Sequence, residues 1–366
     1  MNHHFYIKRC LELAAKGIGR TSPNPMVGAV IVLNGKIIGE GHHQKAGMAH
    51  AEVMAIKNVG LPLHNAILYV NLEPCCHRGR TGPCVEEILR TGIKNVFVGT
   101  IDPNPKVSGK GIALLKKKGV KVRVGFLEKE CRRLNEVYFK YISTQQPFVL
   151  LKLAATLDGM VATGHGDSKW ITSEASRERV HLWRDRMDAI LVGANTVARD
   201  NPRLTTRLVG RKGKDPVRIV LDHQLYVEPT ATVFKKQRKN TPPPIIATAK
   251  GVPSHKRTLF EKKGVEVLEC EKTEDGHLIL TDLLSQLGAL GITSLMVEGG
   301  PGIHSAFLNA KVVDKLMIFF SPRFLGGSSL PMFSGLAVPQ GLKKLPTLKD
   351  LSIEKIGPDI LVTGYL

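Results

Sequence analysis

The sequence contains no long hydrophobic run. The longest uninterrupted runs, such as Met26–Leu33, are far shorter than the roughly 20 residues that a membrane-spanning helix needs. The N-terminal residues contain no apolar segment behind a basic head, so we expect no signal peptide. These absences predict a soluble, cytoplasmic protein with no membrane partner.

Cysteine and aromatic residues are also scarce. Six cysteines in 366 residues are too few and too unevenly spaced for a disulfide framework. Three of them, Cys75, Cys76 and Cys84, lie within ten positions, and in a reducing compartment such clustering favours a metal site over a cross-link. Aromatic residues make up only 5% of the chain, which disfavours the base-stacking surfaces of single-strand nucleic-acid-binding proteins.

Acidic residues are outnumbered by basic ones, 32 to 52, and the net charge of +20 raises the question of nucleic acid binding. The excess is spread along the chain, because residues 1–145 carry 22 basic and 10 acidic residues and residues 146–366 carry 30 and 22. A generally basic surface with sites for phosphorylated small molecules explains this charge better than a nucleic-acid-binding tract does.

The length of 366 residues is typical of two domains. In the first part, an opening helix over residues 2–16 is followed by two β-rich runs on either side of Asn34-Gly35, a dipeptide typical of tight type I′ hairpins. Helical and β-rich segments then alternate, and they end in a charged helical stretch over residues 128–140. This pattern predicts a mainly parallel sheet with helices on both faces and a hairpin at one edge.

We place the domain boundary between about residues 131 and 147, giving domains over residues 1–145 and 146–366. The second domain again alternates helices and strands, which predicts a second α/β fold. Its expected strands lie near residues 148–155, 189–193, 217–221, 245–248, 265–268, 294–297, 316–321 and 360–364, and its expected helices near 174–186, 254–263, 282–290 and 303–309.

A candidate metal site combines one histidine and two cysteines. His50 opens a predicted helix, Cys75 follows the next strand, and Cys84 begins the helix after it. One imidazole and two thiolates suit tetrahedral Zn²⁺, with the fourth position left to water as in catalytic sites. Adjacent residues rarely reach one ion, so Cys84 is favoured over Cys76 as the second thiolate. A structural zinc site and a chance grouping of thiols remain the alternatives.

Glu52 lies two residues beyond His50 and therefore points elsewhere on the helix. A carboxylate there suits proton transfer beside a zinc ion, which lowers the pKa of its bound water to about 7. Zinc-dependent deaminases use this arrangement, with an H-x-E … P-C-x-x-C signature. The sequence departs from that signature, because Arg78 occupies the position of the second cysteine and Cys84 follows after a longer stretch.

The second domain contains a glycine-rich turn, Glu298–Gly302, between a strand and a helix. Glycines let a backbone approach a pyrophosphate, and a helix N-terminus favours its negative charge. The turn is not G-x-G-x-x-G, so by itself it is equally compatible with a tight connection.

Together these motifs resemble one known family, the bifunctional riboflavin-biosynthesis deaminase–reductases. The matching segments are residues 23–28, 41–43, 50–52 and 72–84 in the first domain and residues 153–159, 168–173, 193–197, 200–207 and 298–302 in the second. The family uses the longer spacing between the two cysteines.

The resemblance implies a cytidine-deaminase-like α/β/α domain followed by a dihydrofolate-reductase-like α/β domain. It also implies two reactions. The first is zinc-dependent hydrolytic deamination of the 2-amino group of a diamino-pyrimidinone that carries a ribosylamino 5-phosphate, and the second is NADPH-dependent reduction of the ribose to a ribityl chain.

The resemblance also implies roles for individual residues. In the deaminase domain these are zinc ligands at His50, Cys75 and Cys84, a catalytic Glu52, and substrate contacts at Asn24, His42, His77 and Arg80. In the reductase domain they are NADPH contacts at Ala155, Trp170, Thr196, Asp200, Gly300, Pro301 and Gly302, and substrate contacts at Ser168, Arg184, Leu204, Arg207 and Glu298. Family members commonly self-associate through the reductase half, which implies a homo-oligomer.

Two questions stay open at this point. No side chain stands out as the proton donor for the reduction, and residues 211–241 match the family pattern poorly and receive no role.

Two other classes of protein remain as alternatives. One is a nucleic-acid deaminase of the tRNA-editing kind with an appended binding domain, and the other is a non-catalytic, zinc-stabilised nucleotide-binding scaffold.

Overall fold

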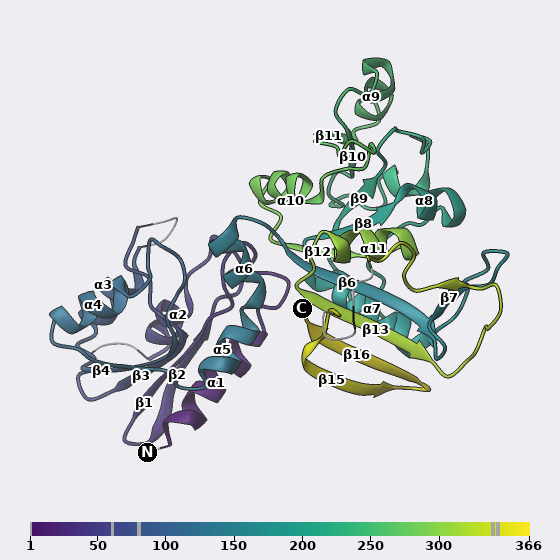
Figure 1. Cartoon of the computed structure of the whole chain (residues 1–366). Coiled ribbons are helices and arrows are strands. Elements are labelled where there is room, and N and C mark those ends of the chain that lie inside the picture. The colour runs from purple at the N-terminus through teal and green to yellow at the C-terminus, as the bar shows by residue number, and fades with distance from the viewer. Residues whose placement is uncertain (1, 60–61, 79–81, 338–340, 342–344) are drawn as a thin grey trace. The chain divides into compact units, whose positions relative to one another are not determined.

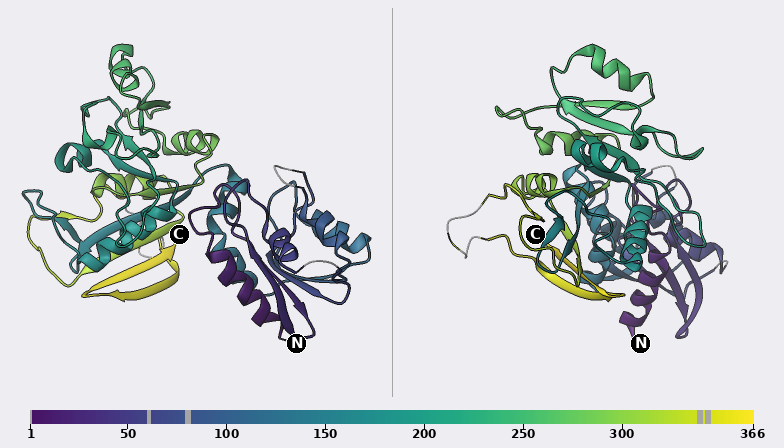
Figure 2. Two further views of the ribbon diagram at one scale, coloured as in Figure 1. Left: turned by 180° about the vertical axis from the view of Figure 1, so that it is seen from behind. Right: turned by 90° about the vertical axis from the view of Figure 1, so that its right-hand side faces the viewer.

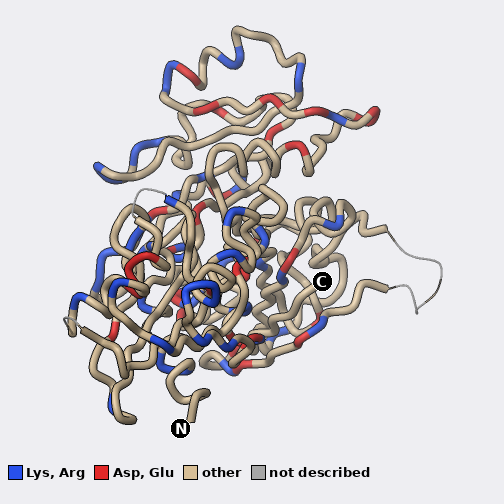
Figure 3. The backbone as a smooth tube through the Cα atoms, turned by 90° about the vertical axis from the view of Figure 1, so that its left-hand side faces the viewer, with Lys and Arg blue, Asp and Glu red and all other residues tan. Residues whose placement is uncertain are grey.

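A computed structural model describes residues 2–59, 62–78, 82–337, 341 and 345–366. The chain forms two compact units, Met1–Gln145 and Gln146–Leu366 (Figure 1). Lys and Arg residues occur along both units rather than in one segment (Figure 3). None of the helices in the described part of the chain combines the length and hydrophobicity that a membrane span requires.

The first unit is built on a five-stranded sheet. The strand order is β2-β1-β3-β4-β5, in which β3, β4 and β5 are parallel and the β1–β2 hairpin lies antiparallel at one edge. The strands are β1 (Gly28–Leu33), β2 (Lys36–His42), β3 (Ile67–Leu72), β4 (Asn95–Thr100) and β5 (Lys121–Val124). The helices are α1 (His3–Ala15), α2 (Ala51–Lys57), α3 (Cys84–Arg90), α4 (Lys110–Lys117), α5 (Glu128–Leu134) and α6 (Glu136–Thr144).

Helices cover both faces of this sheet. One apolar cluster joins the sheet to α2, α3 and α4, and the other joins its opposite face to α1 and α5. Alternate residues of β1 enter different clusters, since Ile31 belongs to the first and Val30 to the second, as the two-residue period of a strand requires. Figure 2 shows the purple helix α1 lying along the first two strands. The expected α/β/α architecture is therefore confirmed.

Two local features of this unit bear on the sequence predictions. Asn34 and Gly35 have φ angles of 50° and 77°, the positive values that a type I′ turn needs, so the predicted hairpin is confirmed. The single helix predicted over residues 128–140 is instead two helices, α5 and α6, which meet at Asn135. The Asn135 side chain accepts a hydrogen bond from the Met26 N–H at 2.7 Å and donates one to the Met26 carbonyl at 2.9 Å.

The second unit contains a nine-stranded sheet in the order β11-β10-β9-β8-β12-β6-β13-β16-β15. Its first seven strands in this order are parallel, and β16 and β15 are antiparallel additions. The strands are β6 (Phe148–Thr156), β8 (Ala189–Gly193), β9 (Val217–Leu221), β10 (Ile245–Ala249), β11 (Glu266–Cys270), β12 (Ser294–Val297), β13 (Lys315–Ser321), β15 (Lys349–Ile356) and β16 (Asp359–Tyr365). A separate small ribbon pairs β7 (Met160–Ala162) with β14 (Leu330–Pro331).

The helices of this unit are α7 (Glu174–Arg186), α8 (Ala194–Asp200), α9 (Ser254–Glu261), α10 (Leu280–Ala289) and α11 (Pro301–Asn309), with a 3-10 turn η1 (Thr232–Phe234). Apolar clusters on the two faces of the sheet enclose it. Because β8, β12 and β6 are parallel neighbours, their carboxyl ends meet at one edge, the usual place for a ligand site in such sheets.

The sequence did not predict α8, β15 or the β7–β14 ribbon. Seven of the eight residues of β15 are exposed, so this edge strand lacks the alternation of apolar and polar residues that marks a half-buried strand. All the other segments predicted in the second unit contain the expected type of element.

Candidate active sites

Three metal-ligating side chains meet beyond the carboxyl end of β3. His50 is the N-cap of α2, Cys75 follows β3, and Cys84 is the first residue of α3. The Nδ1 atom of His50 lies 3.2 Å from the Cys84 sulfur and 3.5 Å from the Cys75 sulfur. One ligand atom from each residue lies within 4.8 Å of the other two, so the predicted cluster is confirmed.

This donor set fits zinc, because an imidazole and two sulfurs are borderline-to-soft ligands in tetrahedral range. His50 and Cys75 are half-buried and Cys84 is buried, and the group found among the described residues has these three members. Cys76 does not join them, since its sulfur lies 3.8 Å from the carbonyl oxygen of Lys106. The preference for Cys84 over Cys76 is thus supported by position.

The two thiols of this cluster share a hydrogen bond that shifts their pKa values in opposite directions. A hydrogen bond from the Cys84 thiol is the main reason that the pKa of Cys75 falls to about 4, and the pKa of Cys84 rises well above its usual value. The backbone N–H of Cys84 also donates to the Cys75 sulfur at 3.3 Å. A metal ion that binds here takes both sulfurs as thiolates, so the proton that the two thiols share is released on binding.

Glu52 is buried next to this cluster, at 3% exposure, and shares a hydrogen bond with Cys84. Burial raises the pKa of the Glu52 carboxyl, with a further contribution from the charge of Cys75. A carboxyl group with a raised pKa holds a proton more readily, which helps it both take and return a proton as a general acid–base group.

Asn24, a predicted substrate contact, lies against a histidine that received no role in the sequence analysis. The Asn24 amide nitrogen lies 3.1 Å from Nε2 of His43, whose ring meets the His50 ring edge-on at 5.3 Å between centroids. His43 is buried, and its Nδ1 lies 3.1 Å from the carbonyl oxygen of Ala49. His43 thus lies between Asn24 and the three candidate zinc ligands.

His42 points to the other face of β2. Neighbouring residues on a strand face opposite ways, and its neighbour Gly41 faces the α2 backbone. His42 instead lines a surface hollow with Lys16 and Ile38. His77 lies just beyond Cys75, and its Nδ1 atom is buried without a hydrogen-bond partner in the described part of the chain. Arg80 lies outside the described residues.

In the second unit, an ion pair joins α7 to the turn after β12. Arg184 contacts both oxygens of Glu298 at 3.1 Å, and the two side chains are only 11% and 13% exposed. Burial alone would raise the pKa of Glu298, but the positive charges of Arg184 and Lys152 lower it to about 2. Arg184 is thus largely occupied by Glu298.

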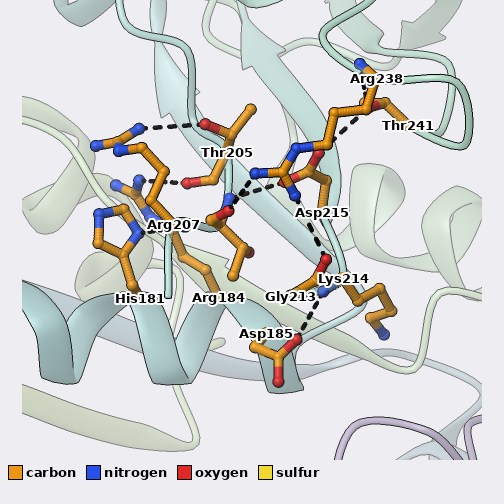
Figure 4. A network of polar contacts seen from close by, with 11 residues as sticks. His181, Arg184, Asp185, Thr205, Arg207, Gly213, Lys214, Asp215, Arg238 and Thr241 are labelled. Carbon is orange, nitrogen blue, oxygen red and sulfur yellow. Dashed lines mark hydrogen bonds and ion pairs between the residues drawn. The ribbon is translucent and has the colours of Figure 1, made fainter. Parts of the chain in front are cut away.

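Arg207 is exposed, as are Arg203 and Arg238, and Figure 4 shows it close to Arg184 and Thr205. Its guanidinium group donates to the Thr205 hydroxyl at 3.1 Å. Burial of part of the side chain and the nearby charges of Arg184, Arg203 and Arg238 lower the pKa of Arg207. Arginine stays charged in spite of such shifts, so these residues create a positive potential suited to a phosphate group.

The glycine-rich turn follows directly, between β12 and α11. Gly299 has a φ of 149° and lies beside Thr196 of α8, and no atom lies within 4 Å of the position of a Cβ on Gly300. Pro301 is the first residue of α11. The N-cap residue is Gly300, which has no side chain to cap the first backbone N–H groups of the helix. This open backbone at a helix N-terminus, with Gly302 in its first turn, fits the pyrophosphate of a dinucleotide.

The other predicted reductase residues border this region. Asp200, at the end of α8, forms a 3.1 Å ion pair with Lys169, which lies between Ser168 and Trp170. The Trp170 ring is exposed, and the Arg177 guanidinium lies 4.7 Å from its centroid. Ala155 is buried at the carboxyl end of β6, and Leu204 is buried with a left-handed φ of 51°.

Comparison with known proteins assigns the chain to a family. A profile described as "RibD C-terminal domain" matches residues 147–362, and one described as "Cytidine and deoxycytidylate deaminase zinc-binding region" matches residues 1–100. "Riboflavin biosynthesis protein RibD" of Aquifex aeolicus is 44% identical over 98% of this chain and 96% of its own length. The Escherichia coli protein of the same name is 37% identical over 98% of each. The chain belongs to the RibD family.

Solved RibD structures share the whole fold. The deaminase/reductase of Thermotoga maritima matches with a TM-score of 0.86 and 38% identity over 99% of this chain and 98% of its own. Acinetobacter baumannii RibD matches with a TM-score of 0.87 and 34% identity over the same shares. The two units are thus the cytidine-deaminase-like and dihydrofolate-reductase-like domains of a bifunctional enzyme of riboflavin biosynthesis, with a zinc-binding deaminase region and a nicotinamide-dependent reductase.

Two residues of this RibD chain had no role in the sequence analysis but lie at its sites. The first is His43, described above. The second is Lys152 of β6, whose pKa is lowered by burial and whose charge acts on Glu298. A lysine inside the apolar strand 148–155 was a detectable signal, because a charged residue rarely occupies a central strand without a partner.

Proposed function

We propose that this RibD enzyme hydrolyses the 2-amino group of a diamino-pyrimidinone carrying a ribosylamino 5-phosphate, and then reduces the ribose with NADPH. The observation that carries the first step is the convergence of His50, Cys75 and Cys84 beside the buried Glu52. The name of the Thermotoga maritima relative includes both activities, a diaminohydroxyphosphoribosylaminopyrimidine deaminase and a 5-amino-6-(5-phosphoribosylamino)uracil reductase.

In the deamination, zinc held by His50, Cys75 and Cys84 would polarise a water molecule. Glu52 takes a proton from that water as its oxygen bonds to the amidine carbon, and returns it to the nitrogen that leaves as ammonia. The raised pKa of Glu52 suits a group that must hold the proton between these two steps. Asn24 and His43 lie where they can orient the pyrimidine over the cluster.

In the reduction, NADPH bound at the glycine-rich turn would supply a hydride to C1′ of the ribose. The bond from C1′ to the ring oxygen breaks and that oxygen takes up a proton, so the sugar opens to a ribityl chain. We assign the substrate phosphate to Arg207, because it is an exposed residue within a group of cations, while the Glu298 carboxylate binds Arg184 and the Asp215 carboxylate binds Arg238. The choice of NADPH over NADH and self-association through residues 146–366 stay predictions.

Replacing Glu52 by glutamine tests the deaminase assignment. The variant should retain its zinc but release ammonia from the diaminopyrimidine phosphate at least about 100-fold more slowly, because it has lost its general acid–base group. Its NADPH oxidation with the deaminated pyrimidine as substrate should be unchanged. Zinc content, ammonia release and NADPH absorbance provide the three measurements.

Glu86→Gln is the matched control, since Glu86 is an exposed residue of α3 whose side chain lies 3.7 Å from that of Arg78. It should behave like the unaltered protein in all three measurements. Wild-type ammonia release by a zinc-loaded Glu52→Gln protein would show that the carboxylate carries no proton in the reaction.

A further inference from the structure

The segment that carries Arg207 has no regular secondary structure of its own. Both backbone groups of Thr206 are bound by side chains from elsewhere: its N–H donates to Asp215 at 2.8 Å, and its carbonyl accepts from Arg238 at 2.9 Å. Figure 4 labels both of these partners. Thr206 is completely buried. Buried backbone groups require such partners, so these two bonds set the path of the chain immediately before Arg207.

Arg238 lies in the loop between η1 and β10, within the stretch that the sequence analysis left without a role. Besides Thr206, its guanidinium contacts the Asp215 carboxylate at 3.6 Å and the Gly213 carbonyl at 3.4 Å. The Asp215 side chain is 3% exposed and also accepts from the Thr241 hydroxyl at 3.2 Å. Arg238 and Asp215 therefore together fix the position of the Thr206 backbone.

Gly213 adds a steric constraint on the position of Thr206. A Cβ on Gly213 would lie 2.4 Å from the Thr206 methyl carbon, which is closer than carbon atoms approach. The Thr206 side chain is thus packed directly against the backbone of residue 213. Both polar and apolar contacts hold Thr206 from this side.

Helix α7 holds the other side of the segment. The Arg207 N–H lies 3.4 Å from Nδ1 of His181, and an Arg184 nitrogen lies 3.3 Å from the Thr205 carbonyl oxygen. Among the described residues, the hydrogen-bond partner of the Arg207 side chain is the Thr205 hydroxyl. The direction of the Arg207 guanidinium thus depends on a backbone that α7 and the 213–241 region fix between them.

We propose that Arg238 is a positioning residue of the reductase: with Asp215 it holds Thr206 so that Arg207 faces the phosphate of the substrate. The inference rests on the proposed role of Arg207 in binding that phosphate. Arg238 does not contact the phosphate but orders the binding group before the substrate arrives, so less conformational freedom is lost on binding. Loss of Arg238 should therefore weaken binding of the phosphorylated substrate while leaving hydride transfer intact.

Kinetics of an Arg238→Gln variant test this proposal in the full-length protein. The KM for the deaminated pyrimidine phosphate should rise about tenfold, with kcat and the KM for NADPH changed less than about twofold. The riboside without its phosphate should be reduced at the same low kcat/KM by both proteins. Arg238→Lys should recover part of the affinity, because an ammonium group can still donate to the Thr206 carbonyl.

Lys239→Gln is the matched control, because it removes the same charge from the same exposed loop next to Arg238. It should change the KM less than about twofold, since it removes only an exposed, screened charge and neither of the hydrogen bonds that hold Thr206. Ammonia release by the deaminase half and the thermal unfolding midpoint report whether each variant is folded.

A double-mutant cycle decides between positioning and direct contact. If Arg238 acts through Arg207, the Arg207→Gln and Arg207→Gln/Arg238→Gln proteins should have the same KM. Additive effects of the two changes, or an equal loss of kcat/KM with the unphosphorylated riboside, would overturn the inference. If Arg207→Gln alone leaves the KM unchanged, the proposed phosphate-binding role fails and the inference fails with it; if it raises the KM but Arg238→Gln does not, only the inference fails.

Discussion

The pKa values of the Cys75 thiol and the Glu298 carboxyl are both lowered, but by different kinds of neighbour. Cys75 is stabilised by hydrogen bonds from Cys84 and His50, whereas Glu298 is stabilised by the positive charges of Arg184 and Lys152. The first arrangement leaves a soft ligand for a metal ion. The second leaves a rigid carboxylate next to the glycine-rich turn.

Replacing Cys84 by serine should abolish zinc binding at the first site. The change removes one of three ligands, and a serine hydroxyl is a poor ligand for zinc at neutral pH. We expect less than about one tenth of the normal zinc content by metal analysis and no detectable ammonia release, with NADPH oxidation retained.

Cys76→Ser is the control for this change, because Cys76 is the adjacent thiol and lies outside the cluster. It should keep its zinc and its deaminase activity. Zinc loss in Cys76→Ser, or full zinc content in Cys84→Ser, would mean that the ligands are assigned incorrectly.

The residues of the metal cluster could be predicted from sequence because their types and spacing are chemically restrictive. His43 could not be separated from His42, since both are histidines at the end of one strand. Which of them faces the cluster depends on the register of β2 against α2, which is fixed by the close approach of Gly41 to Ala51. The signal for Lys152 is a charge inside an apolar strand, which no glycine or arginine motif contains.

At the scale of secondary-structure elements, the approach of β2 to α2 depends on glycine. A Cβ on Gly41 would lie 2.3 Å from the Ala51 carbonyl oxygen and 2.5 Å from the Ala55 nitrogen. Since His50 is the N-cap of α2, a shift of this helix would also move a metal ligand. The position of the helix and that of the zinc site are therefore coupled.

Gly41→Ala should affect the stability of the protein, whereas Gly300→Ala should affect its affinity for NADPH. Gly41→Ala should lower the free energy of unfolding of the first unit by about 1–3 kcal/mol through overpacking, and should reduce zinc content. Gly300→Ala should leave stability within about 0.5 kcal/mol, because no atom lies within 4 Å of the new methyl group. It should instead raise the KM for NADPH, since the methyl group would occupy the backbone surface that faces the pyrophosphate.

Urea unfolding and cofactor titration measure both effects. A normal KM for NADPH in Gly300→Ala would indicate that the cofactor does not approach this turn closely.

Most elements could be predicted because their apolar residues recur with the period of a strand or a helix. The exceptions have physical causes. β15 is an exposed edge strand without a buried face, and α8 is a seven-residue helix that begins directly after β8. The division of α5 from α6 depends on the pairing of Asn135 with Met26, a contact across 109 residues that no local pattern reveals.

At the scale of the whole molecule, acid should destabilise the second unit. Burial is the main reason that the pKa of His181 and that of His304 fall to about 4, and Glu298 has a pKa of about 2. Neutral histidines stabilise the fold above their usual pKa of 6.5, and this stability is lost as pH falls through 6.5 to about 4. The contribution of ionised Glu298 is lost between 4.5 and about 2.

Both tryptophans, Trp170 and Trp183, belong to the second unit, so tryptophan fluorescence follows its unfolding selectively. The urea midpoint should decrease steadily from pH 7 to pH 4, with a loss of order 3 kcal/mol from the buried His304. A midpoint that stays constant over this range would contradict the idea that these histidines are held neutral.

The contacts of Arg238 and Asp215 with Thr206 allow substrate affinity in a RibD enzyme to change without a change in the residues that bind the substrate. The residues that contact a substrate are constrained by its chemistry, but Arg238 lies in a loop with no such constraint. Changes in the length or composition of residues 235–241 can therefore tune how tightly the enzyme holds its phosphorylated intermediate without altering any group that touches it. Directed variation of this loop offers a route to reductases with adjusted affinity and an unchanged reaction.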